Sequence, residues 1–555
     1  MRSNGSRVGT CALILVSAHV CALYCQTRAT DPRAAQPSSI GREVAVPRHL
    51  QDGEEFSVPL EALLAHGQKL FEANWTDQEG GGRPLTKGTG RPIADPTRPL
   101  TGTRAFNRIS APDANSCAGC HNAPYRISGG GGDVVTNVFV LGQRFDFMTF
   151  DRDDTLPTRG AVDETGKPVS LLDAADSRAT TGMFGAGYLE MLARQMTEEL
   201  QRTRDTIHRG ETKDLVAKGI AFGKLALTDA GLWDTSRVKG LGRLSLLSTD
   251  SHNPPTLVIR PWHQASNVIS LREFTNTAYN QHHGIQSTER FGRDTDPDGD
   301  GFANELTRAD VTAVTMWQAT LQVPGRVIPR DPDVEEAVLA GERLFERIGC
   351  ASCHVPRLPL AKQGWIFTEP NPFNPPGNLR KGETRDLKVD LSSALLPAPR
   401  LNPDSSGMVW VEAYTDFKLH DICDGGGREP LDQNQSQWSK KLMDGNCRFL
   451  TKRLWGAANE APFFHHGLFT TLRQSVLAHG GEARDSRVAF QALAPPQRDA
   501  VIEFLKTLQV LPPGTTDRIV DETFHARTWP PPPNRLTQSE PSLQHGQPST
   551  RERLR

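Results

Sequence analysis

The pentapeptide Cys-x-x-Cys-His occurs twice in this chain of 555 residues, at 117–121 and at 350–354. Two thiols at this spacing can each add to one vinyl group of a haem, and the adjacent histidine then reaches the iron as its proximal ligand. The motifs therefore predict two covalently bound haem c groups, called haem one and haem two. The alternative, a zinc site, would require the two distant cysteine pairs to close one site and leaves both histidines without a role. The residues assigned to the haems are Cys117, Cys120 and His121 for haem one and Cys350, Cys353 and His354 for haem two.

An internal repeat precedes the two motifs. Apolar residues at helical spacing begin near Val58 and again near Val334, and each stretch contains Gly-x-x-Leu-Phe, at 67–71 and at 341–345. In the first copy a Gly-, Pro- and Arg-rich insertion at 75–115 separates the helix from the cysteines. Few segments alternate apolar and polar residues as strands do, so we expect a mostly α fold. It would consist of two cytochrome c-like haem domains with long loop insertions.

Shifts in composition along the chain indicate its domain boundaries. Polar, Pro-containing stretches follow the N-terminus and the last apolar helix pattern, and such stretches are typical of linkers and tails. We expect a signal peptide at 1–25, a linker at 26–55, an N-terminal haem domain with a calcium loop at 56–330, a C-terminal haem domain at 331–512, and a Pro-rich, disordered tail at 513–555.

The N-terminus has the features of an export signal. Arg2 and Arg7 precede an apolar run at 11–23 that is short for a bilayer span. We therefore expect a periplasmic or otherwise exported protein without stable membrane insertion; an uncleaved anchor is the alternative. Cys423 and Cys447 lie outside the signal and the motifs, and in an oxidising compartment they are the natural disulfide candidates. Their spacing alone does not prove the bond.

An acidic loop between the two haem motifs follows the calcium-loop pattern D-x-D-x-D-G-x5-E. Oxygens at alternate positions, a glycine at the tight turn and a glutamate placed for bidentate closure suit the shell of roughly six to eight oxygens that Ca²⁺ prefers. The alternative is an exposed Asp-rich turn. The predicted ligands are Asp294, Asp296, Asp298, Asp300 and Glu305.

Four phrases give the chain a resemblance to known proteins. They are MFGAGYLEML at 183–192, HHGIQSTERFGRDTDPDGDGFANELT at 282–307, FKLHDIC at 417–423 and RLWGAANEAPFFHHGLFTTLRQSVLAHGGEA at 453–483. With the two haem motifs, they resemble the dihaem c-type oxidoreductase and peroxidase family, which is related to bacterial dihaem cytochrome c peroxidases. The resemblance implies a redox enzyme with two c-type haems.

The resemblance also implies a second axial ligand for haem two. In dihaem peroxidases this ligand follows a Pro-aromatic-x-His-x-Gly phrase, and the matching position here is His479. The peroxidases often carry Met at this position, and His in place of Met should lower the reduction potential of haem two. The alternative is that His479, which precedes two glycines, only caps the end of a helix.

The distal side of haem one is less defined. No histidine lies between His121 and His208, so the short-range distal histidine of the peroxidases has no counterpart. An imidazole and an acid near an open haem could move a proton between the peroxide oxygens and stabilise the departing hydroxide. The candidates are His283 and Glu289 and, by the resemblance, Glu190. For each, the alternative is a hydrogen-bonded structural residue.

Two main functions fit these observations, beside a narrower one in which the same haem pair oxidises a protein or polymer substrate. In the first, the protein is a peroxidase-like oxidoreductase: a small cytochrome c or cupredoxin donates electrons to haem two, and peroxide is reduced at haem one. In the second, it is a dihaem electron carrier with both irons closed by two protein ligands. We favour the enzyme because 555 residues are many for a two-haem carrier. The formal net charge of −2 gives no reason to expect nucleic acid as a partner.

Overall fold

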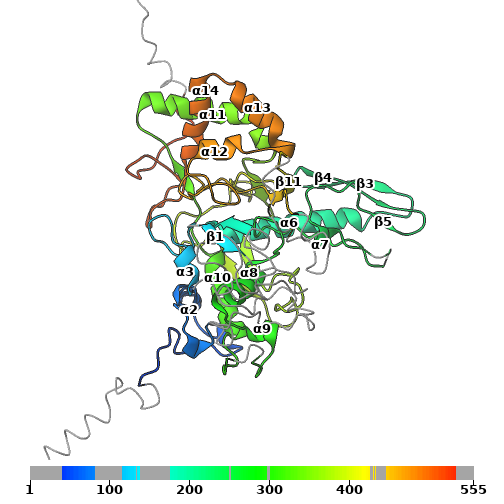
Figure 1. Ribbon diagram of the computed structural model, residues 1–555, viewed down its shortest axis with the longest axis vertical. Helices are drawn as coiled ribbons and strands as arrows, with labels where there is room; N and C mark the ends of the chain where they lie inside the picture. Colours follow the sequence, from blue (N-terminus) through cyan, green and yellow to red (C-terminus); the bar gives the residue numbers. More distant parts are fainter. Residues whose placement is uncertain are drawn as a thin grey trace, which may run out of the picture. The chain divides into compact units, whose positions relative to one another are not determined.

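The computed structural model (Figure 1) describes residues 40–81, 115–132, 134–137, 176–248, 250, 252–296, 300–424, 429, 432 and 445–532. The chain divides into two units, Met1–Ala45 and Val46–Arg555, and the features below belong to the second. The predicted signal peptide lies outside the described residues. Within the described ranges, no helix is long and apolar enough to cross a membrane.

The prediction of a mostly α fold is wrong. Of the described residues, 32% are helical and 15% lie in strands, which form several small sheets. Most of these strands are only two to four residues long. Such strands are too short to show the alternation of apolar and polar residues that identifies a strand in a sequence. Many also pair with segments far away in the chain, so tertiary contacts rather than local pattern determine them.

Two helix pairs carry the internal repeat. At each crossing, the glycine of the Gly-x-x-Leu-Phe core lies directly on the backbone of the partner helix. A Cβ atom on Gly67 would overlap the carbonyl oxygen of Ala313, and one on Gly341 would overlap that of Ala500. Glycine therefore allows both close crossings. The pairs are α2 (Leu60–Glu72) with α10 (Arg308–Ala319) and α11 (Pro332–Arg347) with α14 (Pro495–Lys506).

The remaining helices are mostly short, and several of them hold site residues. The longest is α6, Ala186–Arg204. Helix α8 continues directly into a π-helical segment, Tyr279–His283. Figure 1 shows α11 to α14 grouped together, and α2, α3, α8 and α10 in a second group. The bounds are α3 Cys117–Cys120, α7 Arg243–Leu246, α8 Leu271–Ala278, α9 Thr288–Phe291, α12 Leu472–Leu477 and α13 Arg484–Ala492.

One three-stranded antiparallel sheet packs beside α6. Its strands are β3 (Thr212–Ala217), β4 (Ile220–Leu227) and β5 (Trp233–Asp234). The turn between β3 and β4 consists of Lys218 and Gly219, which have φ of 49° and 79°. Two consecutive residues with positive φ are typical of a tight hairpin turn.

The other sheets have two or three very short strands. The strand β14 lies within 513–555, the segment predicted to be a disordered tail, and it pairs in parallel with β6. The described part of that segment, up to residue 532, is therefore ordered around this pairing. The sheets are β1 (Val134–Asn137) with β2 (Asp176–Ala179), β7 (Leu358–Leu360) with β10 (Val409–Val411), β8 (Ile366–Glu369) with β9 (Leu387–Asp390), β11 (Leu419–Asp421) with β12 (Arg448–Leu450), and β6 (Gly325–Val327) between β13 (Leu508–Gln509) and β14 (Ile519–Val520).

A disulfide joins Cys423 and Cys447, the pair that the sequence left as candidates. Their Cα atoms are 5.4 Å apart, within the range of natural disulfides. The strand leading into Cys423 also holds the loop after α12, because Gly480 N–H donates to the Ile422 carbonyl over 2.9 Å. The disulfide thus fixes a segment that contacts the residue next to His479.

Candidate functional site

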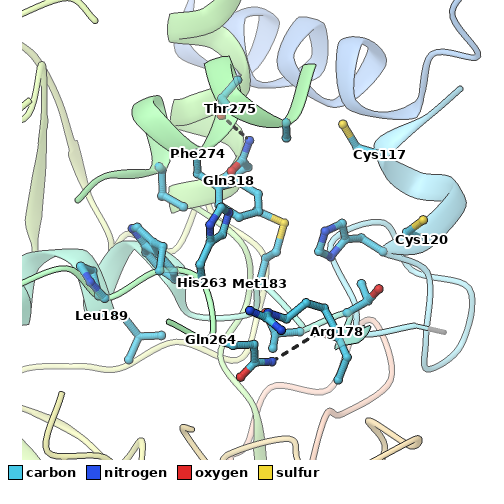
Figure 2. A pocket seen from close by; sticks show the side chains of 18 of the residues that line it. Cys117, Cys120, Arg178, Met183, Leu189, His263, Gln264, Phe274, Thr275 and Gln318 are labelled. Carbon is cyan, nitrogen blue, oxygen red and sulfur yellow. Dashed lines mark hydrogen bonds between the residues drawn. The ribbon is translucent and has the colours of Figure 1, made fainter. Parts of the chain in front are cut away.

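The first haem motif opens into a large, mostly apolar cavity, called cavity one. Helix α3 presents Cys117 and Cys120 to it, and His121 follows as the last residue of the motif. Figure 2 shows both thiols on one side of the cavity. The His121 ring lies 6.0 Å from Phe71, and its Nδ1 is 3.1 Å from the Gly130 carbonyl oxygen. A hydrogen bond at Nδ1 fixes the ring and leaves Nε2 as the nitrogen that can bind iron.

The second motif repeats this arrangement in a separate cavity, called cavity two. Cys350, Cys353 and His354 line it. The Nδ1 of His354 is 3.2 Å from the Tyr414 carbonyl oxygen, and its ring lies 6.3 Å from Phe345. The two cavities measure 1460 and 1350 Å³, including their open parts. Each motif therefore lines a cavity of its own.

The separation of the cavities argues against one shared zinc site. The zinc alternative needed both cysteine pairs at one site, but the first pair lines cavity one and the second lines cavity two. The residues therefore fit haem attachment better than a shared zinc site.

His479 faces His354 across cavity two. The centroids of the two rings are 6.3 Å apart. A metal–imidazole bond is about 2.0 Å long, so two rings that share one metal have centroids roughly 6 Å apart. The Nδ1 of His479 is 2.7 Å from the Ser475 carbonyl oxygen at the end of α12. One nitrogen thus caps the helix while the other is left for iron, so the two roles considered for His479 are compatible.

The distal sides of the two cavities are built from a second internal repeat. Residues 261–278 and 462–479 both begin with a proline, form the same small loop and continue into a helix. Bridges join Trp262 with Val268 in the first copy and Phe463 with Phe469 in the second. The phrases Ser-Leu-Arg-Glu at 270–273 and Thr-Leu-Arg-Gln at 471–474 then start α8 and α12 with the same side-chain cap. This repeat can be read in the sequence, but the prediction from the haem motifs did not include it.

Equivalent positions of the repeat line equivalent walls. Four residues of α8 line cavity one, and their counterparts at or just beyond α12 line cavity two. Ala278 occupies the position that His479 has in cavity two, and its methyl group cannot bind iron. The position of the predicted second ligand of haem two therefore carries no metal-binding side chain in cavity one. The matched sets are Leu271, Phe274, Thr275 and Ala278 in cavity one and Leu472, Ser475, Val476 and His479 in cavity two.

Among the predicted catalytic residues, His283 alone lines cavity one. It lies in the π-helical segment after α8, and its Nε2 is 3.2 Å from the Cys117 Sγ. The ring of Tyr279 packs against it at 5.7 Å. His283 is therefore beside the thiol that would carry a haem bond, which places it at the haem edge.

Glu190 and Glu289 lie in a buried ion-pair network and do not line cavity one. The side chain of Arg272 is fully buried, with Glu289 at 2.8 Å and Glu369 at 3.1 Å. Glu190 pairs with Arg194 and accepts the Leu271 N–H over 2.7 Å. Arg272 and Leu271 begin α8, so the network positions the helix that forms the cavity wall. Neither acid is placed to contact peroxide, and the structural alternative fits both.

Three other residues form the side of cavity one that faces the cysteines. Figure 2 shows Met183, His263 and Gln318 close together, across from α3. Burial lowers the pKa of His263 to about 4, so its ring is neutral at pH 7. Its Nδ1 is 2.9 Å from Asn267 Oδ1, and Gln318 Nε2 donates to Thr275 Oγ1 over 2.9 Å. The sequence analysis did not single out these three side chains, which come from three distant segments.

A thin wall separates the two cavities. Gln264, Leu450, Thr451 and Lys452 line both of them, and Leu450 N–H donates to the Gln264 carbonyl over 2.8 Å. This shared wall gives the two sites a short connection through the protein.

The predicted calcium loop is only partly described, because Asp298 lies outside the described residues. Asp294 accepts a hydrogen bond from Asn304 over 2.8 Å, and Asp296 accepts the Gly301 N–H over 3.0 Å. Glu305 is buried and accepts the Gln286 N–H over 2.8 Å. These bonds shape the loop around its acidic residues, and the calcium assignment stays a prediction.

Comparisons with known proteins agree with the haem assignment. Residues 408–508 match the family model described as "Di-haem oxidoreductase, putative peroxidase", which confirms the predicted resemblance over this segment. This family match supports an oxidoreductase that contains haem. No curated protein matches the chain.

Two solved structures show weak similarity. One is hydrazine synthase of Kuenenia stuttgartiensis, with 14% identity, coverage of 57% of this chain and 87% of that chain, and a TM-score of 0.23. The other is a MauG-like protein associated with microbial copper homeostasis, with 15% identity, coverage of 61% and 90%, and a TM-score of 0.23.

Proposed function

We propose that the protein is an exported, peroxidase-like di-haem oxidoreductase with two covalently bound haem c groups. The family match supports the class, and a cysteine pair in each of two separate cavities supports two cofactors. The observation that carries the proposal is Ala278, which stands in cavity one where His479 stands in cavity two. Haem one is open to a substrate and haem two is closed. Peroxide is reduced at haem one, and a small cytochrome c or cupredoxin donates electrons at haem two.

The two sites differ in the number of histidines that would bind the iron, and this difference gives them different roles. Each haem, when bound, supplies an iron that exchanges one electron at a time. His354 and His479 would hold haem two, which would leave no iron position for a substrate and suits electron transfer. His121, whose ring is fixed by the Gly130 carbonyl, would hold haem one.

His263 and Gln318 handle peroxide on the open side of haem one. Because His263 is neutral and its Nδ1–H is held by Asn267, its Nε2 can accept a proton from hydrogen peroxide. Thr275 orients the Gln318 amide, which can hydrogen-bond the same molecule. Reduction of one hydrogen peroxide to two waters consumes two electrons and two protons. The donor protein supplies the electrons, and solvent supplies the protons by way of His263.

The carrier function has one observation in its favour. Met183 lines cavity one opposite α3, and a thioether there could close haem one. Cyanide titration of the oxidised protein and a turnover assay with peroxide and reduced cytochrome c separate the two functions. Binding of one cyanide per chain together with turnover supports the enzyme. Absence of both supports the carrier.

Replacement of one motif cysteine tests the cofactor assignment. We expect Cys117→Ala to remove one haem per chain and to leave the spectrum of haem two largely intact, because the two cavities are separate. Haem content after periplasmic expression is measured against protein concentration. Cys423→Ala, which breaks the disulfide, is the matched control and should keep both haems. Two haems in Cys117→Ala would contradict the assignment.

The calcium loop is proposed to hold a structural Ca²⁺. A ligand at about one hundred times its Kd stabilises a folded protein by about 2.7 kcal/mol, so removal of Ca²⁺ by a chelator should lower the melting temperature by several degrees. Asp296→Asn, which removes one predicted ligand charge, should melt earlier and respond less to the chelator. If the wild-type protein has the same melting temperature with and without the chelator, the proposed calcium site is wrong.

A further inference from the structure

Three cationic side chains other than histidine line cavity one: Arg178, Lys452 and Arg453. Two of them have carboxylate partners. Arg178 forms an ion pair with Glu429, and both side chains are less than one-tenth exposed. Lys452 pairs with Glu460 at 3.3 Å. The charges of these two cations are therefore balanced within the protein.

Arg453 has no such partner. Among the described residues, none forms a hydrogen bond or an ion pair with its guanidinium. The carboxylate that acts on it through its charge is Glu460, which already accepts the Gly182 N–H over 3.0 Å and pairs with Lys452. Withdrawal from water lowers the pKa of Arg453, which shows the cost of leaving its charge without an anion. The cavity therefore offers an unbalanced positive charge to whatever occupies it.

We propose that Arg453 binds a propionate of haem one. This inference rests on the proposed function, since it requires a haem at Cys117 and Cys120. A haem carries two carboxylates on an otherwise apolar ring, and the planar guanidinium fork matches a carboxylate in a bidentate pair. Arg453 and His121 line the same cavity. The anchor and the residue that would bind the iron therefore belong to one site.

Cavity two has no equivalent of this anchor among its described lining residues. His420 lies between Asp416 at 2.9 Å and Glu482 at 2.8 Å, and Arg487 pairs with Asp424 at 2.6 Å. Lys452, which lines both cavities, pairs with Glu460. Among the described lining residues, an unbalanced cation is therefore found in cavity one, and its positive charge would stabilise the reduced form of haem one.

A redox titration of each haem in the intact protein tests the proposal. We expect Arg453→Met to lower the midpoint potential of haem one and to leave that of haem two unchanged. Arg453→Lys keeps the charge without the fork and should give a smaller shift in the same direction. Arg237→Met, an exposed arginine of the β3–β4 sheet that hydrogen-bonds Thr212, is the control and should shift neither potential.

The outcomes separate this inference from the proposed function. If the first motif carries no haem, the proposed function fails. If haem one is bound and its potential is the same in Arg453→Met and in the wild-type protein, the function stands and the anchor is overturned. If Arg453→Met does not fold, the midpoint potentials of Arg453→Lys test the proposal instead. An unchanged potential of haem one, or equal shifts in the potentials of both haems, overturns the anchor.

Discussion

Ala278→His should convert haem one from an open to a closed site and stop peroxide turnover. Position 278 lies on the cavity wall where the repeat has His479 in cavity two, so an imidazole there should face His121 as His479 faces His354. An intramolecular ligand has a very high effective concentration and competes strongly with peroxide, so turnover should fall by at least about 100-fold. The low-spin fraction should rise from one haem to both. Absorption spectra and peroxide consumption measure the two effects.

Ala278→Leu is the matched control for this change. It adds comparable bulk at the same position without a nitrogen, so it can slow turnover by obstruction but must leave haem one high-spin. A high-spin haem one in Ala278→His would show that position 278 does not face the iron. In that case the structural equivalence of the two distal walls would not extend to ligation.

His479→Ala should have the opposite effect at the other site. Loss of the ring that faces His354 at 6.3 Å leaves haem two with a single protein ligand, so one haem changes from low-spin to high-spin. Added imidazole should enter the vacated space and restore the low-spin signal. Electron transfer from the donor should slow, because a change of coordination would now accompany reduction. Electron paramagnetic resonance of the oxidised variant, with and without imidazole, measures the conversion.

Two neighbouring histidines make this test specific. His466→Ala is the control, because His466 does not line cavity two, and its spectrum should match that of the wild-type protein. His465 does line the cavity, and its ring stacks on Phe449 at 3.6 Å. If His479→Ala stays low-spin while His465→Ala becomes high-spin, the ligand of haem two is His465 and the assignment of His479 is wrong.

The proximal half of the site could be predicted from the sequence because its chemistry is local. Each Cys-x-x-Cys-His places two thiols and one imidazole within a single turn of the chain, so only the cavity beside the motif depends on the tertiary structure. The family resemblance indicated His479 as a candidate ligand, although sequence spacing could not establish that it faces His354. The second repeat, at 261–278 and 462–479, was also readable and would have identified Ala278.

The distal half of cavity one could not be predicted, because tertiary contacts assemble it. Met183 precedes α6, His263 lies in the loop before α8, and Gln318 is near the end of α10. A buried network centred on Arg272 holds α8 in place, and the sequence analysis had assigned two of its acids, Glu190 and Glu289, to catalysis. An acid that positions a helix and an acid that moves a proton look alike in a sequence.

The fold class was mispredicted for a related reason. The helices that cross at Gly67 and Gly341 have clear apolar periodicity and could be read from the sequence. The short strands gain their stability from distant partners, as when β6 pairs with both β13 and β14. No local pattern of two or three residues could reveal such pairing.

The most direct test of the account is an electron paramagnetic resonance spectrum of the oxidised protein after periplasmic expression, repeated after half-reduction. We expect one high-spin signal from haem one beside one low-spin signal from haem two, and the high-spin signal should persist when haem two is reduced. Two low-spin signals in the oxidised protein, with haem one still low-spin after half-reduction, would contradict it. Both irons would then be closed, and the protein would be an electron carrier.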